Sequence, residues 1–137
     1  MAIKNVKKDK LHKKNVKNKV TLQDQKALAL WAADCAEQVL FYFEKECPKD
    51  TNPRKAIEAA RKWACGEITV GEARKAAFAS HSSARSVKNT SAVAAARSAA
   101  HAAATAHVAS HAPHAAEYAF KAVKSTNFKS WFNVWII

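Results

Sequence analysis

Residues 91–111 read SAVAAARSAAHAAATAHVASH and are the most informative part of this chain. They hold a single fixed charge, Arg97, among alanines, small polar residues, histidines and two valines. A helix that is apolar nearly all round is buried, either in the centre of a bundle or in a membrane. Alanine is only weakly hydrophobic, and a membrane span would bury Arg97 and three histidines in lipid. The stretch therefore predicts the central helix of a soluble bundle, which neighbouring helices can approach closely.

The composition of the whole chain agrees with a helical protein. Its 137 residues include 31 alanines but only two glycines and three prolines, too few turn formers for a β-sandwich or a barrel. A hydrophobic fraction of 49% with a charged fraction of 25% argues against disorder. A chain of this length has room for one domain with a sizeable core. We therefore predict an all-α fold, a single-domain bundle of five to six helices around an Ala-rich buried helix.

Capping residues and prolines mark where the helices should begin and end. Thr21 with Asp24, and Thr69 with Glu72, have the spacing of N-terminal caps. Proline disfavours helical geometry in the residue before it and removes a backbone donor, so Pro113 is expected to end the central helix. The predicted helices cover residues 21–47, 53–65, 69–87, 91–111, 113–124 and 125–137.

The formal net charge of +12 is concentrated at the N-terminus. Residues 1–20 hold eight lysines and one aspartate, whereas residues 21–124 hold 14 basic and 10 acidic side chains. We divide the chain into a Lys-rich flexible arm at 1–20, a helical bundle domain at 21–124 and an aromatic C-terminal helix at 125–137. The arm has the charge to tether nucleic acid or an acidic partner, but it lacks aromatic residues that could stack on bases. A solubilising tail is the favoured interpretation, and nucleic acid binding is not expected.

The cysteines and the N-terminus indicate the compartment. Cys35, Cys47 and Cys65 form no CxxC pair, and an odd number cannot all pair within the chain. The basic N-terminus is not followed by the apolar run that a secretory signal requires. We expect a cytoplasmic protein whose reduced thiols pack as small hydrophobic residues.

Histidines cluster near the end of the predicted central helix. His107 and His111 are four residues apart, a spacing that places both imidazoles on one helix face and can chelate a divalent ion. No HExxH motif is present and no cysteine is near by in the sequence, and Pro113 is expected to turn His114 away. The favoured interpretation is that the imidazoles are interhelical spacers and hydrogen-bond donors, without a metal or other cofactor.

A second polar group is expected inside the bundle. His81 lies near the centre of an apolar stripe with Arg85 four residues later, and Arg97 and His101 repeat this spacing on the central helix. Buried basic groups need acceptors, so a linked polar network is expected. It is either a structural network that fixes helix register, which we favour, or a binding pocket with a perturbed histidine. The candidate members are Asp34, His81, Arg85, Arg97, His101 and Thr105.

The C-terminal segment has a strongly aromatic face. Its apolar residues recur at i, i+3, i+4, i+7 and i+8, which predicts an amphipathic helix. A face of this size marks an interaction site, so it should dock on its own bundle, on a second copy as a homodimer, or on a partner. A membrane role is not favoured, because Lys129 is its only basic residue. The candidate interface residues are Phe128, Trp131, Phe132 and Trp135, with Ile136 beside them.

Motifs for catalysis are absent from the sequence. With only Gly66 and Gly71, the chain can form neither a GxSxG elbow nor a glycine-rich phosphate loop. The acidic residues are scattered over the predicted helix exteriors, so a pair of catalytic carboxylates is not expected. The sequence therefore favours a protein that is not an enzyme.

Four short segments carry a family resemblance. They are ALALWAADCAE at 27–37, PRKAI at 53–57 with Trp63, GEAR at 71–74 leading to His81, and AAHAAATAHVA at 99–109. These segments resemble the small all-helical immunity proteins of the Imm-5-like family, and the resemblance covers about residues 27–124. It implies a cytoplasmic prokaryotic protein that binds a cognate toxin and neutralises it by occlusion, with no catalytic activity of its own. Because immunity proteins against nucleases are often acidic, the basic charge of this chain argues against a nuclease target.

Two alternatives come from other functional classes. The first is a helical protein that binds a metal or a small ligand, or an enzyme, centred on His81, His101, His107 and His111. The second is a nucleic-acid-binding module that uses the arm at 1–20.

Overall fold

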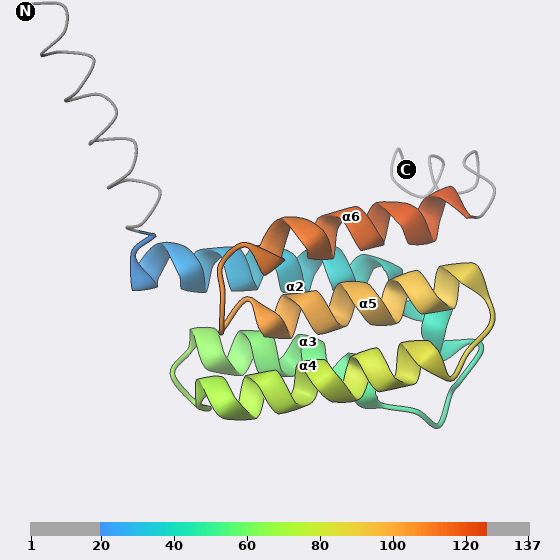
Figure 1. Cartoon of the computed structure of the whole chain (residues 1–137), viewed down its shortest axis with the longest axis horizontal. Helices are drawn as coiled ribbons and strands as arrows, with labels where there is room; N and C mark the ends of the chain where they lie inside the picture. The colour runs from blue at the N-terminus through green and yellow to red at the C-terminus, as the bar shows by residue number, and fades with distance from the viewer. Residues whose placement is uncertain (1–19, 126–137) are drawn as a thin grey trace, which may run out of the picture.

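The computed structural model describes residues 20–125, which form five α-helices and no strand. The helices are α2 (Leu22–Glu44), α3 (Asn52–Ala64), α4 (Val70–Arg85), α5 (Thr90–Ala104) and α6 (His111–Lys124) (Figure 1). The prediction of an all-α bundle is confirmed, with five helices. The predictions of a lysine-rich arm and of an aromatic C-terminal helix concern residues 1–19 and 126–137, which lie outside the described residues.

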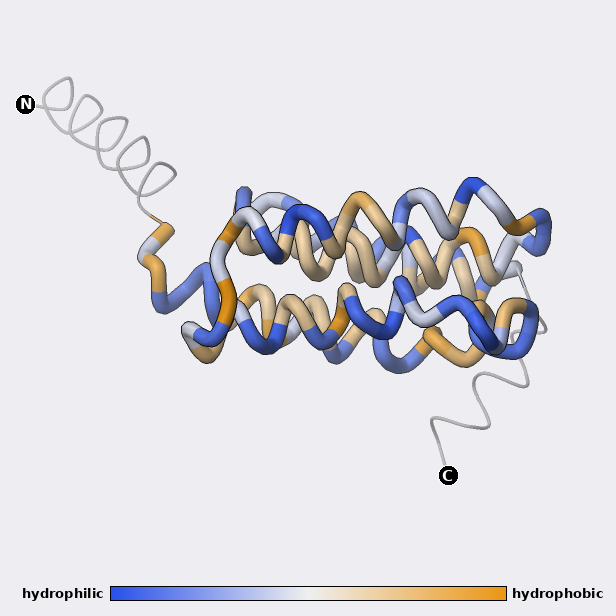
Figure 2. The backbone as a smooth tube through the Cα atoms, turned by 90° about the horizontal axis from the view of Figure 1, so that it is seen from below, coloured by the Kyte–Doolittle hydropathy of each residue, from blue (hydrophilic) through white to orange (hydrophobic). Residues whose placement is uncertain are grey.

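Helix α5 is the centre of the bundle. It packs against α2, α3, α4 and α6, with α2 and α6 on one side and α3 and α4 on the other (Figure 1). Ten of its fifteen residues are buried, and eight of these are alanines. Because an alanine side chain is a single methyl group, neighbouring backbones can come close to α5 on every side. The hydrophilic positions lie mostly on the outer sides of the helices (Figure 2), as expected for helices that bury one face.

Buried serines connect α5 to its neighbours. The hydroxyl of Ser80 on α4 donates to the carbonyl of Ala96 on α5 over 2.7 Å. Toward α6, Ser98 donates to the carbonyl of Ala115 over 2.7 Å. Ser91 donates to the carbonyl of Ala122 over 2.8 Å. A hydroxyl group one carbon from the backbone reaches a carbonyl of the next helix only where the two helices lie very close, so these bonds fix the register of α4, α5 and α6.

The helices begin where capping side chains satisfy the first backbone amides. The hydroxyl of Thr21 accepts from the amide of Asp24 over 3.0 Å, and the hydroxyl of Thr69 accepts from the amide of Glu72 over 3.1 Å. The side chain of Asn89 does the same for α5, accepting from the amide of Ala92 over 3.0 Å. These caps explain why the predicted starts of α2 and α4 agree with the structure to within one residue.

The predicted end of the central helix is wrong. Helix α5 ends at Ala104 instead of residue 111, and a turn at 105–110 separates it from α6. Pro113 does not stop α5 but lies in the first turn of α6, where a proline fits because the amides there have no partner within the helix. As a result, His107 and His111 do not share a helix face, because His107 lies in the turn and His111 opens α6.

A side chain of α2, Gln25, explains why α5 ends early. The side-chain amide of Gln25 donates to the carbonyls of Thr105 and Ala106, over 2.8 and 3.1 Å. A further helical turn would be needed to satisfy these carbonyls from within α5. Gln25 satisfies them instead, so the chain is free to turn toward α6.

Candidate functional site

Four histidines form a row across three helices. The ring of His101 on α5 lies between that of His81 on α4 and those of His111 and His114 on α6. The centroid of the His101 ring is 5.2 Å from the centroids of His81 and His111, and 5.4 Å from that of His114. Its ring also stacks on Tyr118 at 5.3 Å, with an interplanar angle of 10°. We call His81, His101, His111 and His114 the histidine row.

Hydrogen bonds connect members of the histidine row to each other and to charged side chains at its two ends. At the α4 end, Arg97 Nη1 lies 2.6 Å from His81 Nδ1, so the guanidinium donates and the ring accepts. In the middle, His101 Nδ1 and His111 Nδ1 lie 3.0 Å apart, which requires one ring to donate and the other to accept. At the α6 end, His114 Nδ1 lies 3.2 Å from Glu117 Oε2. The row therefore runs from a fixed cation near α4 to a carboxylate on α6.

Three histidines of the row, His81, His101 and His111, are neutral at physiological pH; we call them the inner histidines. Burial, with the charges of Arg97 and Arg85 near by, lowers the pKa of His81 to about 4. Burial also lowers the pKa of His101 to about 4, and charge on the neighbouring His81, His111, His114 and Arg97 lowers it further. The pKa of His111 is lowered, mainly by burial. These imidazoles can thus each donate and accept a hydrogen bond near pH 7, but they do not act as cations.

A pocket opens beside the row, between α4 and the turn that follows α5. Its volume is about 220 Å³. It is lined by Arg74, Ala77, Phe78, His81, Ala104, His107 and His111. No carboxylate is among these residues, and the guanidinium of Arg74 lies over the ring of Phe78 at 5.9 Å. The pocket therefore offers one fixed positive charge, three imidazoles and an aromatic ring that is 63% exposed.

The structure brings together part of the predicted polar network. His81, Arg97 and His101 are neighbours in the row. Thr105 lies one turn beyond His101 and donates from its hydroxyl to the carbonyl of that residue over 2.9 Å. Arg85 is exposed and acts on His81 only through its charge.

Asp34 lies apart from the row. Its carboxylate accepts from Arg61 of α3 over 2.9 Å, and Arg61 also pairs with Glu37 over 2.7 Å. These three side chains form an exposed ion-pair group on the outside of α2 and α3, so Asp34 supplies no acceptor to the histidines.

Two members of the site were not predicted from the sequence as partners of the row, His114 and Tyr118. The signal was present, because His111, His114 and Tyr118 follow one another at i, i+3 and i+7 along α6. Placing the start of α6 at Pro113 concealed it. Arg74 and Phe78 of the pocket carry a similar signal, since they are four residues apart on α4.

Within residues 20–125, no group of three or more His, Cys, Asp or Glu side chains is arranged to hold a metal ion. The two closest ring nitrogens, on His101 and His111, are already partners of each other. The same part of the chain has no helix long and apolar enough to cross a membrane.

A family model described as Imm-5 like putative immunity protein matches residues 18–130, a range that includes all five helices and the whole histidine row. No curated protein and no solved structure matches this chain.

Proposed function

The chain belongs to the Imm-5 like family of immunity proteins, and we propose that it binds a cognate toxin protein and neutralises it by occlusion. The observation that carries this proposal is the family match, which spans residues 18–130. In this function the protein catalyses no reaction and needs no cofactor. Its task is to present a surface that covers the working part of the toxin.

The surface that we assign to the toxin is the rim of the histidine-lined pocket. Phe78 stands out from α4 as a residue that is 63% exposed, and Arg74 lies one turn before it. Val70 on the same helix and Val108 in the turn after α5 are also exposed. Aromatic and arginine side chains carry much of the binding energy in protein interfaces when they enter a pocket of the partner. This combination supports a protein-binding surface.

The charge of the rim indicates the chemistry of the partner. Arg74 is a fixed cation, no acidic residue lines the pocket, and the inner imidazoles are neutral donors and acceptors. An acidic or carboxylate-bearing loop of the toxin fits this surface by charge complementarity. The basic net charge of the chain supports a target other than a nuclease, since an inhibitor that mimics nucleic acid would be acidic.

We place this function in the cytoplasm of a prokaryotic cell. Cys35, Cys47 and Cys65 are free thiols, which is the state expected of cysteines in a reducing compartment.

The test is a growth-rescue experiment with candidate toxins taken from the reading frames beside this gene. Cells that produce the toxin should grow when they also produce this protein, and should stop growing when Phe78→Asp or Arg74→Glu replaces it. Phe41→Asp is the matched control, because Phe41 is similarly exposed at 53% but lies on α2. Death of cells that carry the unchanged protein would overturn the immunity function. Full rescue by both pocket variants would overturn only the assigned surface.

A second candidate function is the binding of a small anionic ligand in the same pocket. The observation that favours it is the cavity of about 220 Å³ with Arg74 and three histidines in its wall. A ligand with a carboxylate and an apolar ring would meet Arg74 and Phe78 together. Titration with benzoate, followed by the melting temperature, tests this candidate. An increase that is lost in Arg74→Ala supports it, and an unchanged melting temperature argues for the toxin surface alone.

A further inference from the structure

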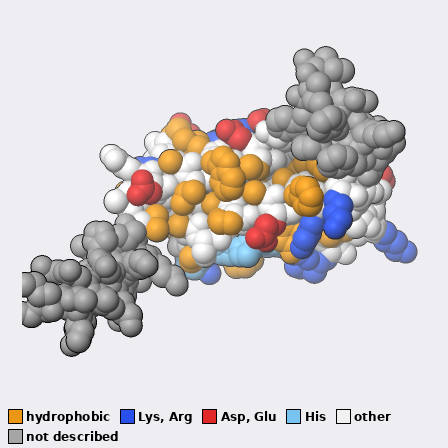
Figure 3. Space-filling view, turned by 90° about the horizontal axis from the view of Figure 1, so that it is seen from above, with side chains coloured by type: hydrophobic (Ala, Val, Ile, Leu, Met, Phe, Trp, Pro, Cys, Tyr) orange, Lys and Arg blue, Asp and Glu red, His pale blue; other side chains and the backbone are white. Residues whose placement is uncertain are grey.

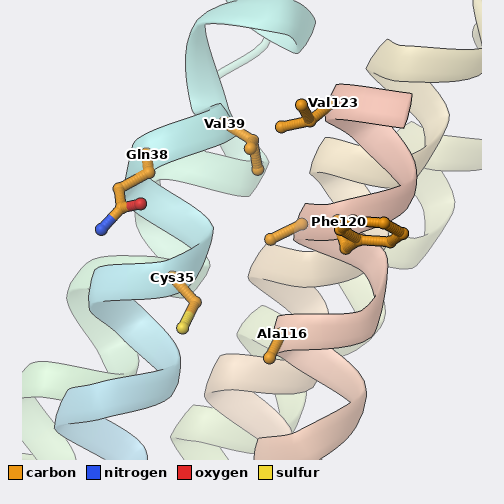
Figure 4. A pocket seen from close by; sticks show the side chains of 7 residues that line it. Cys35, Gln38, Val39, Ala116, Phe120 and Val123 are labelled. Carbon is orange, nitrogen blue, oxygen red and sulfur yellow. The ribbon is translucent and has the colours of Figure 1, made fainter. Parts of the chain in front are cut away.

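A groove runs between α2 and α6 on the face opposite α3 and α4. Its volume is about 170 Å³. Cys35 and Val39 of α2 point across it toward Ala116 and Val123 of α6 (Figure 4). Gln38 and Phe120 stand at its two rims, each turned away from the opposite helix (Figure 4). The bottom of the groove is therefore made of small side chains, with larger ones only at the edges.

The groove is lined mainly by apolar side chains. Its seven lining residues are Cys35, Gln38, Val39, Ala116, Ala119, Phe120 and Val123, and none of them is ionised in its ordinary state near pH 7. Phe120 is 58% exposed, and Trp31, one turn before Cys35 on α2, is 46% exposed. Hydrophobic side chains gather over this face of the bundle (Figure 3). Exposed apolar area of this kind marks an interaction site.

The chain itself contains an apolar segment of about the length of the groove. Helix α6 ends at Lys124, and the sequence continues for 12 residues after Ser125. Along α6 the groove extends from Ala116 to Val123, about 10 Å at 1.5 Å per residue. The aromatic face of the segment extends from Phe128 to Ile136, about 12 Å if helical. The two apolar surfaces thus match in length.

The connection to the groove is short enough for a helical hairpin. Ser125, Thr126 and Asn127 separate α6 from Phe128, and two antiparallel helices need a loop of only about two to five residues. Serine, threonine and asparagine are poor helix formers that favour such turns. A chain that turns back at this point runs along α6 and meets the groove directly.

We propose that residues 126–137 of this chain fold back as an amphipathic helix and fill the groove between α2 and α6. The face with Phe128, Trp131, Phe132, Trp135 and Ile136 packs against the groove. Ser130 and Asn133 lie toward the other side of such a helix and remain in water. Lys129 lies at the edge of the packed face, from which its ammonium group reaches water. No charge of the segment is buried, and none of the groove is needed for the toxin surface around Phe78. The proposal is therefore independent of the immunity function.

The thiol of Cys35 reports on this contact. It is half-buried in the groove, whereas Cys65 is exposed and Cys47 packs against the core near α6. Burial raises the pKa of the Cys35 thiol, so alkylation is measured at a pH of about 8.5, where more thiolate forms. We expect Cys35 to react with N-ethylmaleimide at least about tenfold faster in a chain that ends at Ser125 than in the full chain. The rate of Cys65 should be the same in both.

One internal control and two variants test whether the change at Cys35 is specific. A truncated bundle that has loosened as a whole would also expose Cys47, so the alkylation rate of Cys47 must be the same in both chains. In the full chain, Phe120→Asp at the rim of the groove should also speed alkylation of Cys35. Phe78→Asp, a matched change at an exposed phenylalanine of α4, should leave the rate unchanged.

Two outcomes overturn the proposal. Equal Cys35 rates in the full and the truncated chain mean that the segment does not cover the groove. Protection that increases with protein concentration, together with a dimer mass in light scattering, assigns the groove to a second copy of the chain.

Discussion

The guanidinium of Arg97 on α5 donates a 2.6 Å hydrogen bond to Nδ1 of His81 on α4. A ring nitrogen that accepts a hydrogen bond carries no proton, so His81 must be neutral with its proton on Nε2. Protonation of this ring removes the acceptor and places a second positive charge beside Arg97. The contact between α4 and α5 therefore depends on pH.

The free energy of unfolding should decrease as the pH falls from about 6.5 toward about 4. In the unfolded chain His81 and His101 gain protons near their ordinary pKa of 6.5, whereas in the folded protein each has a pKa of about 4. Between these values the unfolded state binds more protons, so stability is fully present above the upper value and is lost below it. We expect a loss of about 2 kcal/mol after allowing for solvent screening. Urea denaturation at a series of pH values measures it.

The control for this pH effect is His81→Gln, which cannot be protonated. Its stability should depend less on pH over the same interval, because His101 and His111 still contribute but His81 does not. Identical pH profiles for the variant and the unchanged protein would mean that His81 is solvated in the folded state.

Replacing His101 with alanine should destabilise the bundle. The change removes the ring that lies between His81, His111 and Tyr118, and leaves His111 without its partner at 3.0 Å. We expect a loss of about 1–3 kcal/mol in the free energy of unfolding. His107→Ala, at an exposed position of the turn, should change it by less than about 0.5 kcal/mol. Equal melting temperatures for the two variants would contradict a packed histidine row.

Replacing a buried alanine of α5 with a larger residue should lower the free energy of unfolding. Ala99 is fully buried and belongs to the core between α5 and its neighbours, so the extra atoms of leucine in Ala99→Leu would force the helices apart. Overpacking of this kind costs about 1–3 kcal/mol. Ala27→Leu, at an exposed position of α2, is the matched control. Chemical denaturation of both variants tests this, and equal stability would show that the core around α5 has spare room.

Removing the side-chain amide of Gln25 should loosen the end of α5. In Gln25→Ala the carbonyls of Thr105 and Ala106 lose their donor, with an expected cost of about 1 kcal/mol. Amide hydrogen exchange in the turn at 105–110 should become faster. Gln23→Ala, two residues earlier and exposed, should leave exchange in this turn as it was. Unchanged exchange in both variants would mean that the turn holds without Gln25.

The predictable parts of the fold are those that local residues determine. The caps at Thr21 and Thr69 act on amides three residues away, so the sequence around each one contains the whole signal. The all-round apolar pattern at 91–111 likewise carried enough information to identify the central helix. The end of α5 was missed because its cause, Gln25, is 80 residues away from Thr105 in the sequence.

The site shows the same division between local and distant causes. His81, Arg97 and His101 could be brought together from their positions on two helix faces, and the structure places them in contact. Asp34 was a candidate member of the polar network, but it pairs with Arg61 instead. This partner becomes available only through the packing of α3 on α2. His114 was set aside because Pro113 was expected to break the helix, whereas α6 includes both residues.

The central position of α5 has a consequence for how the protein comes apart. Among the five described helices, α5 is the one that contacts all the others. A partial bundle without it would expose the inner faces of α2, α3, α4 and α6 together, with little core left to hold them. Local openings that spare α5 are therefore small, and an opening that includes it amounts to global unfolding. For a protease in the cell, such a bundle is either almost entirely resistant or entirely degradable, so its abundance depends on the stability of one alanine-rich helix.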